Sequence, residues 1–82
     1  MKAVQEVLYD LVSPMVENHD SLRVEALESL NENEIICVIY AKNDDIARLI
    51  GRQGVMAQAI RSTMALASRV HDKHISIKFE SY

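Results

Sequence analysis

Cysteine, proline, glycine and tryptophan are scarce or absent in this chain, and the scarcity of cysteine excludes two classes of protein. The single cysteine, Cys37, cannot form a disulfide framework within the chain or a zinc site made of several thiolates. It lies in the apolar run of residues 35–39, where no activating neighbour is evident. We therefore expect Cys37 to be a small buried hydrophobe and not a nucleophile.

Long hydrophobic runs are also missing. No stretch of the sequence approaches the ~18 consecutive apolar residues of a membrane-spanning helix. Gln5, Glu6 and Asp10 interrupt the N-terminal segment, which therefore lacks the apolar core of a signal peptide. We expect no membrane span and no export signal, which leaves the cytoplasm as the expected location.

The length of 82 residues predicts a single domain that spans residues 1–82. The composition, 49% hydrophobic and 26% charged, allows both a buried core and solubility. A domain of this size buries only about 60–65% of the surface that its unfolded chain exposes. Its stability is therefore expected to depend partly on a partner.

An overall excess of positive charge is absent, because the net charge is −3 at pH 7, but the charges are unevenly distributed. Residues 1–41 hold two cations and eight acidic residues, a net charge of −6. Residues 42–70 hold five cations and two acidic residues, a net charge of +3. For a charged ligand, this local excess matters more than the total.

Both glycines of the chain lie in the segment Ile-Gly-Arg-Gln-Gly, residues 50–54, within the basic region. Apolar residues with helical spacing run into this segment and out of it. The pattern predicts two helices joined by a four-residue Gly-x-x-Gly turn. Because glycine has no Cβ, Gly51 and Gly54 allow positive φ angles and the close approach of another backbone. The N–H groups that begin the second helix, with their partial positive charge, suit a phosphate.

The first half of the chain divides into a helix and two strands by hydrophobic periodicity. An amphipathic helix is predicted over residues 2–17, with a kink or an end and restart at Ser13-Pro14, where Ser13 offers a cap. Residues 21–30 predict a strand that bulges near Ala26-Leu27. Residues 31–33 predict a hairpin turn, and residues 34–41 a central strand with one face covered by helices.

The second half contributes two further helices and one strand. Asn43 is the expected N-cap of a short helix over residues 44–50, and Asp44 and Asp45 lie in its first turn. Residues 55–70 predict the helix after the turn, and the alternating residues 74–80 predict a strand with one solvated face. The order α-β-β-α-α-β predicts an α+β domain in which three helices cover one face of a three-stranded sheet.

A Gly-x-x-Gly turn with local positive charge favours the binding of single-stranded nucleic acid. Without a Cβ in the way, a sugar–phosphate backbone can approach and bond to Arg52, Gln53 and backbone N–H groups. Ile46, Leu49 and Ile50, with parts of the following helix and the central strand, are expected to form an apolar shelf for bases. The candidate RNA-binding residues are Arg48, Ile50, Gly51, Arg52, Gln53, Gly54 and Arg61.

The residues leave other interpretations open. The turn alone is compatible with a plain connection between two helices. The acidic first half favours a module whose main partner is another protein, with little RNA binding. An enzyme has little support, because no nucleophile, base and oxyanion donors can be assembled by spacing. His71 and His74 lack metal-ligand support, so we expect no metal, no cofactor and no small-molecule substrate.

Several of these segments together resemble a known family. Asn43-Asp44-Asp45, Ile50-Gly51-Arg52-Gln53-Gly54 and Ala59-Ile60-Arg61 are similar to the corresponding segments of KH domains with the bacterial, type II topology. The chain length and the start of the first helix resemble the small single-KH proteins of the KhpA or YlqC type. The resemblance covers essentially the whole chain and implies RNA binding, with residues 51–54 as the clamp on the RNA backbone.

The same resemblance implies partners and a cellular role. It implies a homodimer, or a heterodimer with the larger KH protein KhpB, also called Jag or EloR. The lack of a long apolar run separately predicts no membrane partner. It also implies regulation at the level of RNA, linked to cell elongation and division. The family usually has a basic residue after the second glycine, where this chain has Val55. Arg52 is therefore expected to carry a larger share of the phosphate contact.

Overall fold

The computed structural model describes residues 3–28 and 32–82, and its helices and strands follow the predicted order. They are α1 (Val4–Val12), β1 (Arg23–Glu28), β2 (Glu34–Ala41), α2 (Asn43–Ile50), α3 (Val55–His71) and β3 (His74–Ser81). Short 3-10 helices lie at Ser13–Met15, His19–Ser21 and Arg52–Gly54. The predicted hairpin turn begins outside the described residues. The helices of the described ranges are too short or too polar to cross a bilayer.

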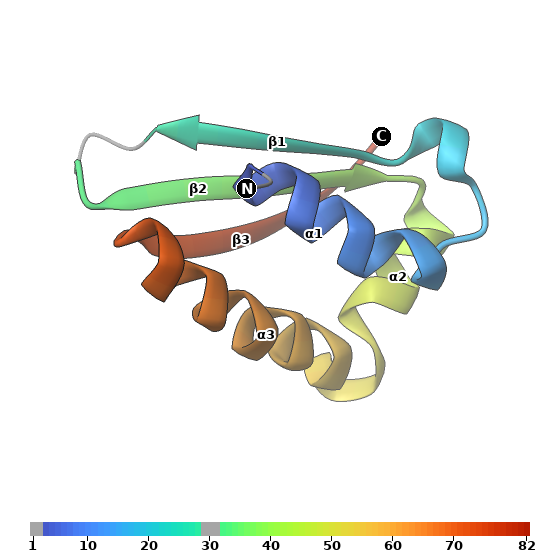
Figure 1. The fold of residues 1–82 in the computed structure, drawn as a ribbon. Helices are drawn as coiled ribbons and strands as arrows, with labels where there is room; N and C mark the ends of the chain where they lie inside the picture. Colours follow the sequence, from blue (N-terminus) through green and yellow to red (C-terminus); the bar gives the residue numbers. More distant parts are fainter. Residues whose placement is uncertain (1–2, 29–31) are drawn as a thin grey trace.

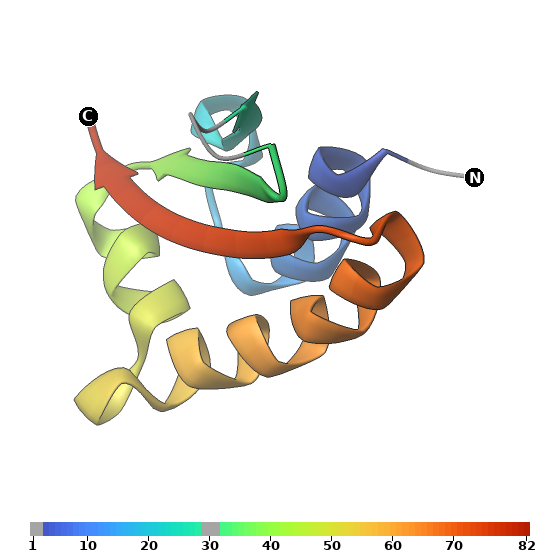
Figure 2. The same ribbon diagram turned by 90° about the vertical axis from the view of Figure 1, so that its left-hand side faces the viewer.

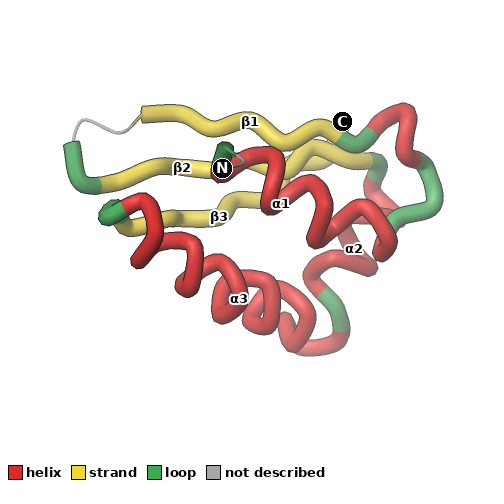
Figure 3. Tube along the Cα trace, viewed as in Figure 1, coloured by secondary structure: helices red, strands yellow, loops and turns green. Residues whose placement is uncertain are grey.

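The strands form one mixed sheet in the order β1-β2-β3 (Figure 1). β1 and β2 pair antiparallel, whereas β2 and β3 pair in parallel. The parallel pairing follows because the chain between β2 and β3 crosses over through α2 and α3. All three helices lie on the same face of the sheet (Figure 3). This is the predicted α+β architecture, with β2 as the central strand.

The hydrophobic core lies between the sheet and the helices. Its buried members are Val4, Leu8, Val12, Val16, Leu22, Cys37, Ile39, Ala41, Leu49, Ile60, Met64 and Ile77. They come from alternate positions of the strands and from the inward faces of the helices, as the two periodicities require. Burial raises the pKa of the Cys37 thiol, which keeps it protonated and unreactive. The predicted burial of Cys37 is therefore confirmed.

The first strand is regular. Each residue from Arg23 to Glu28 pairs with one residue of β2, so the predicted bulge near Ala26-Leu27 is wrong. Val24 packs against the core, and Leu27 therefore lies on the opposite face of the sheet, where it is 47% exposed. A single exposed leucine is common on a protein surface and does not require an irregular strand.

Proline ends the first helix. α1 stops at Val12, and Ser13–Met15 form one 3-10 turn, so of the two predicted alternatives the helix ends instead of kinking. Pro14 has no N–H for the next helical hydrogen bond and crowds the preceding turn. The predicted cap by the Ser13 side chain is wrong, because this residue contributes its carbonyl. That oxygen accepts a hydrogen bond from the Val16 N–H at 3.4 Å and lies 2.7 Å from His19 Nε2.

Asp45 connects the segment after α1 to the start of α2. Its buried carboxylate accepts hydrogen bonds from the backbone N–H groups of Glu17 and Asn18, both at 3.0 Å. Arg48, one turn later in α2, pairs with Asp45 at 2.6 Å and with Glu17 at 3.3 Å. The two backbone hydrogen bonds, and then Arg48, lower the pKa of Asp45. We call Glu17, Asn18, Asp45 and Arg48 the Asp45 cluster.

The start of α2 differs from the prediction by one residue. Asn43, the predicted N-cap, is the first helical residue, and Lys42 holds the cap position with an extended backbone. The place of Asp45 in the first turn of α2 predicts only that its carboxylate complements the helix dipole. The carboxylate also accepts hydrogen bonds from the segment after α1. The Asp45 cluster thereby fixes the helix that leads into the Gly-x-x-Gly turn.

Candidate nucleic-acid interface

The Gly-x-x-Gly turn depends on backbone angles that favour glycine. α2 ends at Ile50, and Gly51 leaves the helix with φ 75° and ψ 175°. Residues 52–54 form one 3-10 turn, closed by a hydrogen bond from the Gly54 N–H to the Gly51 carbonyl at 3.2 Å. Gln53 (φ 58°) and Gly54 (φ 78°) are left-handed, and α3 begins directly afterwards at Val55. The left-handed angle at Gln53 costs about 1–2 kcal/mol, so the turn is held in place by its flanking helices.

The two glycines serve different purposes. A Cβ added at Gly51 would lie 2.7 Å from Met56 Cγ, 2.9 Å from Met56 Cβ and 3.0 Å from Met56 N. Gly51 is therefore required so that the turn can pack against the first turn of α3. A Cβ added at Gly54 would meet nothing within 4 Å. The α-carbon of Gly54 faces open space, where another molecule can approach the backbone.

The tip of the turn presents donors to solvent. Arg52 and Gln53 are both exposed. Directly behind them, α3 begins with Gly54 at its cap position and Val55, Met56, Ala57 and Gln58 in its first turn, without an acidic residue. The positive end of the dipole of this 17-residue helix is therefore not offset by a carboxylate in that turn. The guanidinium, the side-chain amide and the helix N-terminus together form a surface suited to an anion.

The predicted apolar shelf is smaller than expected. Leu49 is fully buried, so it does not form the shelf as predicted, and Ile46 is partly buried against the core. The predicted contribution of the central strand is also wrong, because the core-facing residues of β2 are covered by helices. Ile50 follows Leu49 by about 100° around the helix and is 36% exposed. With the exposed Val55 on the other side of the turn, it leaves a narrow apolar margin next to the tip.

The structure places Arg48 in the Asp45 cluster. Its guanidinium bonds to Asp45 and lies within ion-pair distance of Glu17. Two carboxylates therefore already compensate the charge of this candidate RNA-binding residue. Sequence spacing suggested a basic residue near the turn, and it could not indicate the partner Glu17, which lies 31 positions earlier in the chain.

Arg61 lies on α3 and reaches across to β3. Its guanidinium carbon is 5.6 Å from the centre of the Phe79 ring, and Nη2 donates a long hydrogen bond of 3.4 Å to the Ile77 carbonyl. A groove runs between the two elements at this point. Figure 2 shows how α3 and β3 lie relative to each other. We call it the α3–β3 groove, lined by Arg61, Ala65, Ser68, His74, Ile75, Ser76 and Ile77.

The sequence interpretation missed β3 as a wall of the site. β3 stands at one end of the strand order, so its outer edge pairs with no other strand of the described sheet, and Arg61 of α3 reaches its Ile77 carbonyl. The signal was available, because two helices between β2 and β3 imply a crossover and hence parallel strands. Parallel pairing on the free side of β2 leaves β3 at the edge nearest the turn.

These features define a class of protein. A mixed three-stranded sheet with the order α-β-β-α-α-β, covered on one face by three helices, is the type II KH fold. More narrowly, the chain belongs to the KhpA/KhpB KH-domain family, whose family model matches residues 5–79. The resemblance drawn from the sequence is therefore confirmed.

Two curated relatives illustrate the distance within this family. The chain is 24% identical over 75 residues to proteins named RNA-binding protein KhpA from Listeria monocytogenes and Listeria innocua. Each alignment covers 92% of this chain and 96% of the relative. No solved structure gives a significant match.

Proposed function

We propose that this protein binds single-stranded RNA through the α2–α3 turn and the α3–β3 groove. The observation that carries the proposal is the open space at the Gly54 α-carbon, beside the exposed Arg52 and Gln53. The positive φ angles of both glycines would favour glycine in a plain connection as well, so the support comes from the open space at Gly54 together with the exposed donors beside it. The relatives named RNA-binding protein KhpA add support.

The proposed contacts follow from the chemistry of each part. The RNA backbone approaches Gly54, where Arg52 and the N–H groups at the start of α3 bond to phosphate oxygens and Gln53 bonds to sugar or phosphate. Bases lie over Ile50 and along the α3–β3 groove, in the single-stranded and unstacked form that proteins usually recognise in RNA. The protein acts as a binding module, and no reaction step is assigned to it.

The low number of available cations sets the expected affinity. With Arg48 engaged by carboxylates and Val55 in the position after Gly54, Arg52 and Arg61 are the cations nearest the proposed path. Two neutralised phosphates predict a log–log salt slope of about −1.4 for a single strand. We therefore expect weak binding that depends on the turn.

A double substitution at the tip tests the proposal. Arg52→Asp together with Gln53→Asp removes the cation and adds two carboxylates at exposed positions, one of which is left-handed and tolerates aspartate. We expect circular dichroism to show an intact fold. We also expect that the variant no longer raises the fluorescence anisotropy of a labelled oligouridylate. If the folded variant binds RNA as well as the wild type, the turn is not the clamp.

A second candidate function is docking to a protein, either a second copy or a larger KH protein of the KhpB type. The row Val55, Ala59, Ser62, Leu66 and Val70 follows one side of α3 and is exposed. Its three large members are 62%, 64% and 60% exposed and carry no charge. Apolar rows of this kind are typical of helix–helix contacts between proteins.

Sedimentation over a range of concentrations tests this docking surface. Leu66→Glu with Val70→Glu is expected to abolish self-association, whereas Leu27→Glu is a control at an apolar position on the sheet that is 47% exposed. Self-association that survives the double substitution would exclude α3 as the surface. A dimer that crosslinks to no RNA in cells would favour docking as the main function.

For the cell, we propose that RNA binding serves post-transcriptional regulation in the cytoplasm, linked to elongation and division. The basis is the family resemblance. Ultraviolet crosslinking followed by sequencing of the bound RNAs provides the test. Enrichment of transcripts for elongation and division proteins would support the link, and a random sample of cellular RNA would contradict it.

A further inference from the structure

A second cationic site lies at the far end of α3. Asp72, at the C-cap, has a left-handed backbone with φ 55°, and its N–H bonds to the Ser68 carbonyl. The Lys73 N–H bonds to the same carbonyl at 3.2 Å, and the His74 N–H bonds to the Asn33 carbonyl at 2.7 Å. These hydrogen bonds reverse the chain, so β3 starts beside the last turns of α3.

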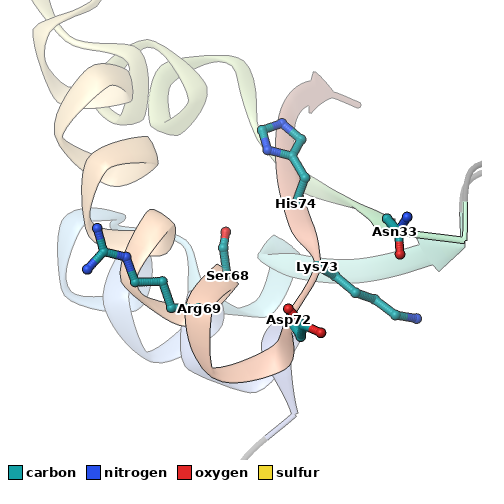
Figure 4. Close-up of a pocket in the computed structure, with 6 residues that line it drawn as sticks. All are labelled: Asn33, Ser68, Arg69, Asp72, Lys73 and His74. Carbon is teal, nitrogen blue, oxygen red and sulfur yellow. The ribbon is translucent and has the colours of Figure 1, made fainter.

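A shallow, open hollow of about 590 Å³ lies at this reversal. It is lined by Asn33, Ser68, Arg69, Asp72, Lys73 and His74, and we call it the end hollow (Figure 4). Figure 4 shows Ser68 and Arg69 on the last turns of α3 and His74 on the adjacent start of β3, with the Arg69 and Lys73 side chains extending to opposite sides. A guanidinium, an ammonium, a hydroxyl and an imidazole are the groups that proteins use to bind phosphate.

The end hollow continues the α3–β3 groove. Ser68 and His74 line both. On α3, Gly54, Gln58, Arg61, Ala65 and Ser68 follow one another at alternating steps of four and three residues and therefore lie along one side of the helix. This row spans about 21 Å. That length exceeds one nucleotide, and a single strand of several nucleotides can follow it. It contains no acidic residue, and Asp72 lies beyond its end.

We propose that the end hollow binds a backbone phosphate of the same RNA strand, several nucleotides away from the phosphates at the turn. This inference rests on the proposed RNA binding and extends its footprint beyond the clamp. Ser68 and Arg69 approach the phosphate from α3, His74 approaches it from the start of β3, and Lys73 from the turn between them. The Arg69 and Lys73 side chains, which extend to opposite sides, turn inward to reach it. Asp72 opposes the contact, because its carboxylate lies within the same lining.

Oligonucleotide length separates the two sites. A KH turn clamps about four nucleotides, so tetrauridylate tests the turn, whereas an oligouridylate of about ten residues reaches the end hollow as well. We expect Arg69→Gln with Lys73→Gln to weaken the affinity for the longer oligonucleotide by about tenfold and to leave the affinity for tetrauridylate unchanged. The salt slope for the longer oligonucleotide should become shallower by about 0.7 for each phosphate that the variant no longer neutralises.

Two further variants sharpen this test. Asp72→Asn keeps a residue that accepts the left-handed conformation and removes the opposing charge. It should therefore raise the affinity for the longer oligonucleotide alone, by about twofold to threefold. Arg23→Gln removes an exposed cation from β1, at the opposite end of the strand order, and should change neither oligonucleotide.

The outcomes distinguish the failure of this inference from the failure of the proposed function. If Arg69→Gln with Lys73→Gln leaves the longer oligonucleotide unaffected, or weakens both lengths equally, the end hollow is not a separate phosphate site. If tetrauridylate binding survives Arg52→Asp with Gln53→Asp, the turn is not the clamp, whatever the end hollow does. If the wild type binds neither oligonucleotide, both proposals fall.

Discussion

Two adjacent stretches of the chain, the α2 helix and the tip of the turn that follows it, each carry an arginine. The arginine of the helix is paired with carboxylates, and the arginine of the tip is exposed to solvent. In α2, Asp45 and Arg48 bond to each other and to the segment after α1. At the tip, Arg52 and Gln53 are exposed to solvent. The cation in the helix maintains the fold, whereas the cation at the tip is available to a ligand.

The two glycines repeat this division. Gly51 packs against Met56, and Gly54 faces open space. A residue type and its place in a motif therefore do not reveal whether it serves packing or binding. The contacts of each residue make that distinction, and they lead to predictions that separate the two roles.

The largest expected effect is on stability, at Gly51. Gly51→Ala would force a side chain into an angle region that only glycine occupies readily, and would bring its Cβ within 3.0 Å of Met56. Strain and overpacking together predict a loss of about 2–5 kcal/mol. Urea unfolding measures this loss as a shift of the midpoint, with the dependence of the unfolding free energy on urea concentration unchanged.

Gly54→Ala is the matched control. Its left-handed angle costs about 1–2 kcal/mol in stability, and its methyl group meets nothing within 4 Å. We expect a smaller shift of the unfolding midpoint and a clear loss of RNA affinity in the folded protein. Equal losses of stability at the two glycines would contradict the division between packing and binding.

The next expected effect is the pH dependence contributed by Asp45. Its pKa is lower in the folded protein than the usual value of 3.8, so its contribution to stability is fully present above about pH 4. The contribution is lost as the pH falls through the lowered pKa, because protonation removes the negative charge that strengthens the hydrogen bonds from the Glu17 and Asn18 N–H groups and the pair with Arg48. Thermal unfolding of the wild type and Asp45→Asn from pH 7 to pH 2 tests this.

We expect Asp45→Asn to be less stable than the wild type near neutral pH, and the difference to shrink on acidification. Because the stabilising form is the carboxylate, the wild type must lose more stability than the variant in this window. Parallel pH profiles would show that Asp45 does not carry the effect.

Much of the fold could be predicted because it depends on local patterns. The alternation in residues 74–80, the apolar run around Cys37 and the glycines at 51 and 54 each report on their own neighbourhood. The apolar side chains of residues 34–41 were enough to predict a central strand, and the order of the elements to predict three helices on one face of the sheet.

The candidate site was less predictable because its contacts join distant parts of the chain. Asp45 and Arg48 are recognisable as helix residues, but their partners near residue 17 come together with them only after folding. The edge position of β3 and the end hollow likewise require the crossover from β2 to β3. Proximity to the turn suggests ligand contact for Ile46 and Leu49, although helical phase directs Leu49 into the core.

The smallest expected effect concerns the two arginines on either side of Gly51. Arg52→Gln should weaken RNA binding several-fold and make the salt slope shallower by about 0.7, because one phosphate is no longer neutralised. Arg48→Gln makes the same chemical change four residues earlier and should leave the salt slope unchanged, since its charge is already compensated by Asp45 and Glu17. It should lower thermal stability slightly instead. Anisotropy titrations at several salt concentrations, with thermal melts of both variants, compare them directly. Equal changes in slope would mean that RNA draws Arg48 away from its carboxylates, and α2 would then belong to the binding surface.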